Sequence, residues 1–223
     1  MADESTALGM PKDVFWGSRG EDRKWREQNT WNSIDWGRIG RAVHFYQQRG
    51  YLSAEVPWVV DPKFCAATYP HTRTFTTEHG DLVGSAEQSF LALAAAGVLD
   101  MRKAYVGVSP CFRDNQPNDR FHNPYFLKVE LYHPEPRYKT RLSACAYDAA
   151  EFFRSEGAFP EFEETDEGWD INVGGIEVGS YGNREVYDHF WTYGTGLAEP
   201  RFSQALHLQE RYVRDRIDGP ESL

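Results

Sequence analysis

The sequence predicts an α+β fold in which an antiparallel β-sheet is flanked by helices. Segments typical of strands and segments typical of helices follow one another along the chain, without internal repeats. Two strand-like segments, 103–113 and 123–136, flank one polar, turn-rich loop, which is typical of antiparallel neighbours. With 223 residues, the chain predicts an N-terminal extension over 1–30 and one domain over 31–223.

The first element predicted is a helix over residues 36–49. Gly50 is suited to end it, because glycine readily takes the left-handed conformation at a helix C-terminus. The next segment, 51–60, is predicted as a strand with Pro57 at its edge or end. The helix prediction rests on apolar side chains at helical spacing: Ile39, Val43 and Tyr46.

A hairpin and a second helix come next. Residues 71–84 favour a hairpin, because Thr and Phe favour strands and His-Gly-Asp marks a turn. The segment 85–99 is predicted as a helix, with Ser85 as its N-cap and Glu87 in its first turn.

The second half of the chain follows the same rules. We interpret the acidic run over 161–167 as a solvated loop. The remaining elements predicted are strands over 103–113 and 123–136, a strand-rich segment with glycine interruptions over 169–188, and helices over 143–157 and 199–217.

Composition restricts the classes of function. The formal charge of −10 argues against loose, charge-driven binding of nucleic acid, which needs a basic surface. No apolar run approaches the 18 residues of a membrane span, so we expect no membrane partner. The three cysteines form no CxxC pair, which favours free thiols in a reducing, cytoplasmic compartment.

Arg113 is the first candidate site residue. It follows an apolar strand and opens a polar loop that returns through His122 to Phe126. A half-buried arginine needs an anionic partner, and its guanidinium suits a carboxylate or a phosphate. Phe126 could offer its ring face to a flat ligand. Taken alone, this stretch favours the plainer alternative of a structural Arg–Asp pair beside a core phenylalanine.

A second group of candidates lies nearer the C-terminus. Gly194 and Gly196 predict a glycine-rich turn that lets the backbone approach a ligand, and Arg201 follows at the start of a helix. That combination is typical of a polyphosphate environment. Glu177 and Ser180 are spaced E-x-x-S, and their oxygens could hold Mg²⁺.

The order of these motifs resembles the catalytic domain of class II aminoacyl-tRNA synthetases, over about residues 36 to 215. Motif 1 of that family, a long helix and then a strand ending in proline, is matched over 40–60. Motif 2 is F-R-x-E, a loop and H/R-x-x-x-F, and motif 3 is G-x-G-x-G-x-x-R. The matching residues are Phe112, Arg113, His122 and Phe126 for motif 2, and Gly194, Gly196 and Arg201 for motif 3.

The resemblance implies an ATP site. Arg113 would bind the α-phosphate and the reacting carboxylate, and Phe126 would stack on adenine. Arg201 would cover the opposite face of adenine and reach the γ-phosphate, while His122 would touch the γ-phosphate side. Asn115 stands where motif 2 has glutamate, and its carbonyl could accept a hydrogen bond from the adenine amino group.

The resemblance also implies sites for a metal and an amino acid. Glu177 and Ser180 would hold Mg²⁺, in an E-x-x-S pattern like that of the aspartyl and asparaginyl branch. Glu87, in a segment similar to the T-x-E of the seryl type, would take the substrate α-amino group. Arg184, four residues after Ser180, would read the substrate side chain. The full predicted set for the amino acid is Ser85, Glu87, Lys128, Glu130 and Arg184.

The implied activity is that of an ATP-dependent ligase that forms an aminoacyl-adenylate. Few residues flank the motifs, so we expect a bare catalytic domain without an anticodon-binding domain. The acceptor is left open among a carrier protein, a small molecule and tRNA. Motif 1 forms a dimer interface in the family, which implies a homodimer.

Two departures from the motifs keep other functions open. Asn115 replaces the motif 2 glutamate, and Ala198 replaces the third glycine of motif 3, at little cost unless that residue needs a positive φ. A catalytically inactive paralogue with a regulatory or amino-acid-binding role is one alternative. A minimal tRNA-charging enzyme, or an amide ligase similar to an asparagine synthetase, is the other.

Overall fold

The computed structural model describes residues 34–69, 74–113, 125–134, 139–186 and 188–218. The N-terminal extension expected over 1–30 lies outside these ranges, as do the candidate residues Asn115 and His122.

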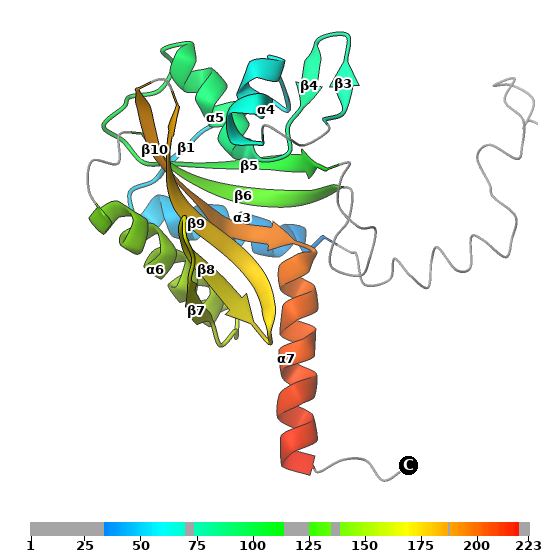
Figure 1. Cartoon of the computed structure of the whole chain (residues 1–223). Coiled ribbons are helices and arrows are strands. Elements are labelled where there is room, and N and C mark those ends of the chain that lie inside the picture. The colour runs from blue at the N-terminus through cyan, green and yellow to red at the C-terminus, as the bar shows by residue number, and fades with distance from the viewer. Residues whose placement is uncertain (1–33, 70–73, 114–124, 135–138, 187, 219–223) are drawn as a thin grey trace, which may run out of the picture.

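Seven strands form the main sheet, in the order β1-β5-β6-β10-β9-β8-β7 (Figure 1). Every neighbouring pair is antiparallel except β1 and β5, which are parallel. The predicted α+β class with a large antiparallel sheet is therefore confirmed. The strands are β1 (Leu52–Ser53), β5 (Tyr105–Phe112), β6 (Tyr125–Pro134), β7 (Glu161–Glu164), β8 (Gly168–Val173), β9 (Ile176–Val186) and β10 (His189–Glu199).

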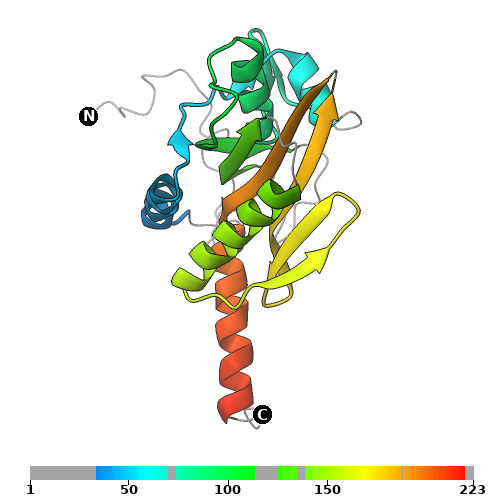
Figure 2. The same ribbon diagram turned by 90° about the vertical axis from the view of Figure 1, so that its left-hand side faces the viewer.

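A smaller sheet and five helices complete the described structure. The small sheet has the order β2-β4-β3. Its strands are β2 (Val59–Val60), β3 (Thr76–Thr77) and β4 (Gly80–Leu82), and the helices are α3 (Trp36–Gln48), α4 (Pro62–Thr68), α5 (Ala86–Ala95), α6 (Lys139–Ser155) and α7 (Arg201–Asp218). Figures 1 and 2 both show α7 extending away from the main sheet. None of the described helices is long and apolar enough to cross a membrane.

The two faces of the main sheet carry different cores. Successive strand residues point to opposite faces, so neighbours such as Val106 and Tyr105 pack on different sides. Val106 and Leu131 pack with α3 and α6 in the larger core, whereas Tyr105 and Tyr132 pack with α5. The three cysteines are free and buried, as the sequence predicts.

Local capping explains where two predicted helices begin and end. The Asp35 side chain accepts a hydrogen bond from the Arg38 backbone amide at 2.8 Å, which caps α3. Gly50 follows the helix with φ of +89°, the left-handed conformation that ends many helices. Ser85 caps α5 and Glu87 lies in its first turn, as predicted. Helix α6 begins at Lys139, earlier than the sequence indicated.

Two segments differ from their predictions. Residues 51–60 form two short strands in different sheets, β1 and β2, instead of one strand. Pro57 lies between them and has no backbone N–H to continue a ladder. The acidic run over 161–167 is not a solvated loop, because its first half is the edge strand β7 and Glu167 reaches a cavity.

The prediction of a glycine-rich turn around Gly194 and Gly196 is also wrong. Both residues lie inside β10, where they make room for core side chains. A Cβ atom at Gly194 would lie 2.5 Å from Cys145 Sγ and 2.6 Å from Tyr181 Cδ1. A Cβ atom at Gly196 would lie 2.7 Å from the Tyr46 ring. These glycines therefore permit close packing of the sheet against α3 and α6.

We predict that Gly194→Ala destabilises the protein by about 1–3 kcal/mol, because the added methyl overpacks the core. Gly40→Ala is the control, since Gly40 lies on the exposed face of α3 with nothing within 4 Å of its Cβ position. That change should stabilise the helix by about 0.5–1 kcal/mol. Urea unfolding of both variants measures the difference. Equal stability of Gly194→Ala and the wild type would contradict the packing role.

Candidate functional site

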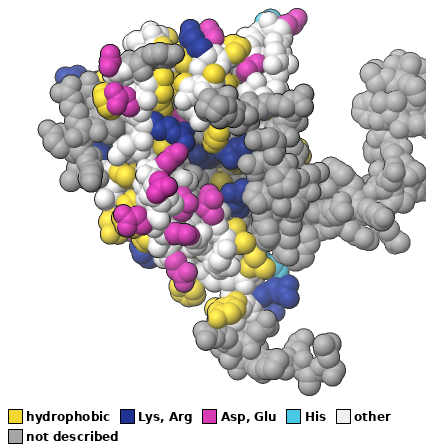
Figure 3. Space-filling model, in the orientation of Figure 1, with side chains coloured by type: hydrophobic (Ala, Val, Ile, Leu, Met, Phe, Trp, Pro, Cys, Tyr) yellow, Lys and Arg dark blue, Asp and Glu magenta, His cyan; other side chains and the backbone are white. Residues whose placement is uncertain are grey.

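A cavity of about 220 Å³ lies on the α5 side of the main sheet, lined by residues of α5, β6, β9, β10 and α7. It brings together residues from distant parts of the chain that the sequence singled out. Eight predicted site residues line it: Glu87, Arg113, Phe126, Lys128, Glu177, Ser180, Arg184 and Arg201. Figure 3 shows Lys and Arg side chains gathered at the centre of one face, with Asp and Glu side chains beside them.

Two β-bulges position the lining of this cavity. The register between β8 and β9 shifts so that Val178 is an extra residue between Glu177 and Gly179. The register between β6 and β10 shifts in the same way at Gly196, between Thr195 and Leu197. A bulge reverses the alternation of side chains beyond it. Residues three apart therefore share the cavity face in each strand, namely Glu177 with Ser180 and Thr195 with Ala198.

Arg113 occupies one wall of the cavity. Its Nε donates to the Gly84 carbonyl at 3.2 Å, and its Nη2 donates to the Tyr69 hydroxyl at 3.0 Å. Its guanidinium carbon lies 5.1 Å from the centroid of the Phe126 ring. Within the described parts of the chain, no carboxylate pairs with Arg113. The cation is held by neutral groups and a ring, an arrangement suited to an anionic ligand.

Arg201 occupies another wall, as the first residue of α7. Its Nη1 lies 3.7 Å from Glu177 Oε1. The Glu177 side chain is half exposed, so this ion pair is a weak constraint on either group. Arg113 and Arg201 thus line one cavity together with Phe126, from three different elements of the fold.

Glu177 and Ser180 offer oxygen ligands on the β9 side of the cavity. One carboxylate and one hydroxyl suit Mg²⁺, which keeps several waters and is usually completed by substrate phosphates. Among the described residues, no group of three or more His, Cys, Asp and Glu side chains is arranged to hold a metal ion. These two residues would therefore need further oxygen atoms from a ligand to hold the ion.

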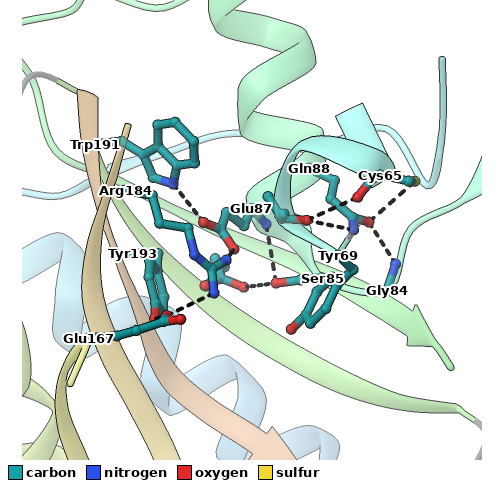
Figure 4. Close-up of polar contacts among 12 residues, drawn as sticks. Cys65, Tyr69, Gly84, Ser85, Glu87, Gln88, Glu167, Arg184, Trp191 and Tyr193 are labelled. Atoms are coloured by element: carbon teal, nitrogen blue, oxygen red, sulfur yellow. Dashed lines mark hydrogen bonds and ion pairs between the residues drawn. The ribbon is translucent and has the colours of Figure 1, made fainter. Parts of the chain in front are cut away.

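Glu87 lines the same cavity from the first turn of α5 (Figure 4). Only 2% of its surface is exposed. Its Oε2 is 2.7 Å from Arg184 Nη1, and its Oε1 accepts a hydrogen bond of 2.6 Å from Trp191 Nε1. Burial raises the pKa of the Glu87 carboxyl, and Arg184 and Trp191 offset part of that rise. The buried carboxylate is thus fully partnered.

Glu167 is a residue of this site that the sequence did not indicate. It lies in the turn between β7 and β8, and its Oε2 accepts hydrogen bonds from Tyr193 Oη at 2.7 Å and Arg184 Nη2 at 3.1 Å. The Tyr193 hydrogen bond, and then Arg184, hold the pKa of the Glu167 carboxyl below its usual value despite burial. Only its place in an acidic run marks it in the sequence, and that signal does not separate it from its neighbours.

Ser85 and Glu130 do not line the cavity, but they hold residues that do. Ser85 Oγ donates to Glu130 Oε2 at 2.8 Å and accepts from the Glu87 amide at 3.4 Å. Lys128 Nζ lies 2.9 Å from Glu130 Oε2, and both side chains are buried. The attraction of Glu130 raises the pKa of Lys128 although burial lowers it. This group fixes the N-terminus of α5 against β6.

We predict that Arg184→Met destabilises the protein by about 3–5 kcal/mol at neutral pH, because it leaves the buried Glu87 carboxylate without its cation. Folding already raises the pKa of Glu87, so loss of Arg184 raises it further and protonation relieves the penalty. The deficit relative to the wild type should shrink as pH falls through the raised pKa. Urea unfolding at several pH values measures it.

The double variant Arg184→Met, Glu87→Gln is the control for that measurement. It removes both charges together, so it should lose less stability than Arg184→Met alone. A double variant that is less stable by the sum of the two single changes would show that the pair is not energetically coupled.

Two solved structures have a similar fold, and both are of seryl-tRNA synthetases. The enzyme from Pyrococcus horikoshii, complexed with ATP, matches with a TM-score of 0.61 and 20% sequence identity over 74% of this chain and 47% of that chain. The cytoplasmic serine-tRNA ligase from Naegleria fowleri, in complex with AMP, matches with a TM-score of 0.58 and 16% identity over 73% of this chain and 51% of that chain. The chain thus spans about half the length of these enzymes.

The sequence itself matches no protein-family model and no curated protein. The structural likeness therefore rests on the arrangement of helices and strands. The described structure has the α+β fold of class II aminoacyl-tRNA synthetase catalytic domains, with a large antiparallel sheet flanked by helices.

Proposed function

We propose that the protein is an ATP-dependent ligase that activates an amino acid as an aminoacyl-adenylate. The observation that carries the proposal is the shared cavity of Arg113, Phe126 and Arg201, in a fold similar to that of enzymes solved with ATP and AMP. Two guanidinium groups and an aromatic ring around one cavity suit a ligand that carries both phosphates and a flat base.

In the proposed reaction, a carboxylate oxygen of the amino acid attacks the α-phosphorus of ATP. The new bond joins carboxylate and phosphorus, and the bond to the departing pyrophosphate breaks. This chemistry needs no nucleophile from the protein, only positioning and neutralisation of charge. Arg113 suits that role because its cation faces the cavity without a described carboxylate partner.

Other residues have supporting roles in the proposal. Phe126 stacks on one face of adenine, and Arg201 covers the other face and contacts the terminal phosphates. Glu177 and Ser180 hold Mg²⁺, which when bound neutralises charge on the phosphate oxygens. The outward lone pairs of Glu87 accept the α-amino group, since each carboxylate oxygen can accept more than one hydrogen bond.

The acceptor of the activated amino acid belongs to the same proposal. Transfer to a carrier protein, a small molecule or tRNA would complete the ligase reaction. Incubation with a labelled amino acid, ATP and each class of acceptor identifies it, because the label moves to the acceptor only in the matching reaction.

We predict that Arg113→Ala abolishes amino-acid-dependent exchange between pyrophosphate and ATP, a loss of at least about 100-fold for a preorganised transition-state contact. All twenty amino acids are tested with the wild type, with aspartate and asparagine first because of the position of Arg184. Arg102→Ala is the matched control, since Arg102 is exposed, pairs with Asp100 and does not line the cavity. Near-normal exchange by folded Arg113→Ala would contradict the proposal.

We also propose a homodimer formed through α3 and the adjoining edge strand β1. Trp36 and Leu52 are 66% and 45% exposed on these elements, and a dimer interface would cover them. Light scattering should give twice the mass of the chain. Trp36→Glu should shift it toward the monomer, whereas a wild-type monomer would contradict the motif 1 assignment.

A further inference from the structure

Arg184 is held between two glutamates in the part of the cavity proposed for the amino acid. Nη1 of its guanidinium pairs with Glu87 at 2.7 Å, and Nη2 pairs with Glu167 at 3.1 Å. The guanidinium carbon lies over the Tyr193 ring, 4.3 Å from its centroid. Figure 4 shows these side chains converging from α5, β9, β10 and the turn before β8. Both ends of the guanidinium are therefore already occupied by carboxylates.

We propose that Glu167 is a specificity-determining residue that excludes acidic amino acids. The substrate is then an amino acid with an uncharged side chain that donates a hydrogen bond. This inference rests on the proposed amino-acid activation and narrows its substrate. It removes aspartate from the pair of amino acids, aspartate and asparagine, that the position of Arg184 puts first.

The geometry of the Arg184 guanidinium disfavours a ligand carboxylate. An arginine recognises a carboxylate most strongly when two of its N–H groups point along one fork. In this cavity the two terminal nitrogens bind two different carboxylates, Glu87 and Glu167. A ligand carboxylate would have to displace one of them, or approach both at contact distance and meet like-charge repulsion.

The charge of the groups around Arg184 also disfavours an acidic side chain. The other cation in this region, Lys128, pairs with Glu130. The three carboxylates of Glu87, Glu130 and Glu167 carry one negative charge more than Arg184 and Lys128, the two cations with which they pair. A further anion is disfavoured there, whereas the protonated α-amino group of an amino acid is favoured.

The two glutamates differ in how exposed their side chains are. Glu87 is 2% exposed and bridges Arg184 to Trp191, so it belongs to the packed framework. The Glu167 side chain is 61% exposed and reaches the cavity from a turn closed by hydrogen bonds between Thr165 and Gly168. Glu167 can therefore be changed without leaving a buried charge unpaired. It covers the side of Arg184 that faces solvent and an incoming ligand.

The same carboxylate offers a positive criterion for the substrate. Both hydrogen bonds to Glu167 reach Oε2, so Oε1 can accept one from a ligand hydroxyl or amide. A carboxylate only accepts, so it selects ligand groups that donate. A neutral donor side chain satisfies this criterion without adding a charge.

Glu167→Gln tests the proposal. The change keeps the shape of the side chain and its bond to Arg184 while it removes the charge. In pyrophosphate exchange, wild type should use asparagine or serine at least about tenfold better than aspartate, a typical penalty for a like charge at contact. Glu167→Gln should raise the rate of exchange with aspartate, relative to the rate with asparagine, by at least about tenfold. Glu164→Gln is the matched control, because it removes the same charge from an exposed residue outside the cavity.

Binding of aminoacyl-sulfamoyl adenosines separates this inference from the proposed activity. These analogues carry an amino acid on a nucleoside without a reactive phosphate, and calorimetry measures their affinity. If the wild type binds the asparaginyl or seryl form better than the aspartyl form and Glu167→Gln narrows the gap, the inference stands even where exchange is absent.

Three outcomes would overturn the inference. The first is tightest wild-type binding of the aspartyl or glutamyl form, and the second is tightest binding of the lysyl form. The third is that Glu167→Gln leaves the ratio of exchange with aspartate to exchange with asparagine unchanged while Arg113-dependent exchange persists. That result would leave the proposed activity intact. Failure of every analogue to bind the folded wild type would count against both the substrate class and the activity.

Discussion

The two β-bulges, at Val178 in β9 and Gly196 in β10, are the constraint on which the rest of the site depends. In a regular strand, residues three apart point to opposite faces. Without the first bulge, either Glu177 or Ser180 would turn toward the packed core, where an unpaired carboxylate is costly. The second bulge stays in place because the Tyr46 hydroxyl donates to the Gly196 carbonyl at 2.8 Å and its ring fills the space of a side chain. Helix α3 thus supports the backbone of β10.

Charge pairing divides the cavity into two ends with different chemistry. Near α5, Arg184 and Lys128 each have a buried carboxylate partner, so both cations are paired before a ligand arrives. Elsewhere in the cavity, Arg113 is held by a carbonyl, a hydroxyl and rings, and Arg201 lies 3.7 Å from the half-exposed Glu177. A polyanion would gain most beside Arg113, because no described carboxylate has to be displaced there. This asymmetry supports the proposal that phosphates bind near Arg113 and the amino group near Glu87.

Local sequence signals predicted the elements whose ends are determined by neighbouring residues. Gly50 and Ser85 marked a helix end and a helix start because capping acts within one turn. The order of Arg113, Phe126 and Arg201 predicted residues that line one cavity, although their distances follow only from the sheet. These local signals do not predict which strands, distant in the sequence, pair with one another. The prediction of a glycine-rich turn failed because Gly194 and Gly196 pack on Tyr181 and Tyr46, and Glu167 was missed because its partners come from β9 and β10.

A buried ion pair connects helix α3 to the end of β10, one of the strands that line the cavity. Arg38, in the first turn of α3, lies 2.6 Å from Glu199 Oε1 at the end of β10, and it also pairs with Glu156 after α6. Glu199 is fully buried and accepts a hydrogen bond from Ser203 in α7. Breaking such a pair leaves an uncompensated buried charge, so α3, α6, β10 and α7 are held in one arrangement. Arg201 stands two residues after Glu199, so its position at the cavity is tied to the helix proposed as the dimer interface. Assembly of two chains through α3, as proposed, would then restrain the start of α7 and with it the wall of the cavity that Arg201 forms.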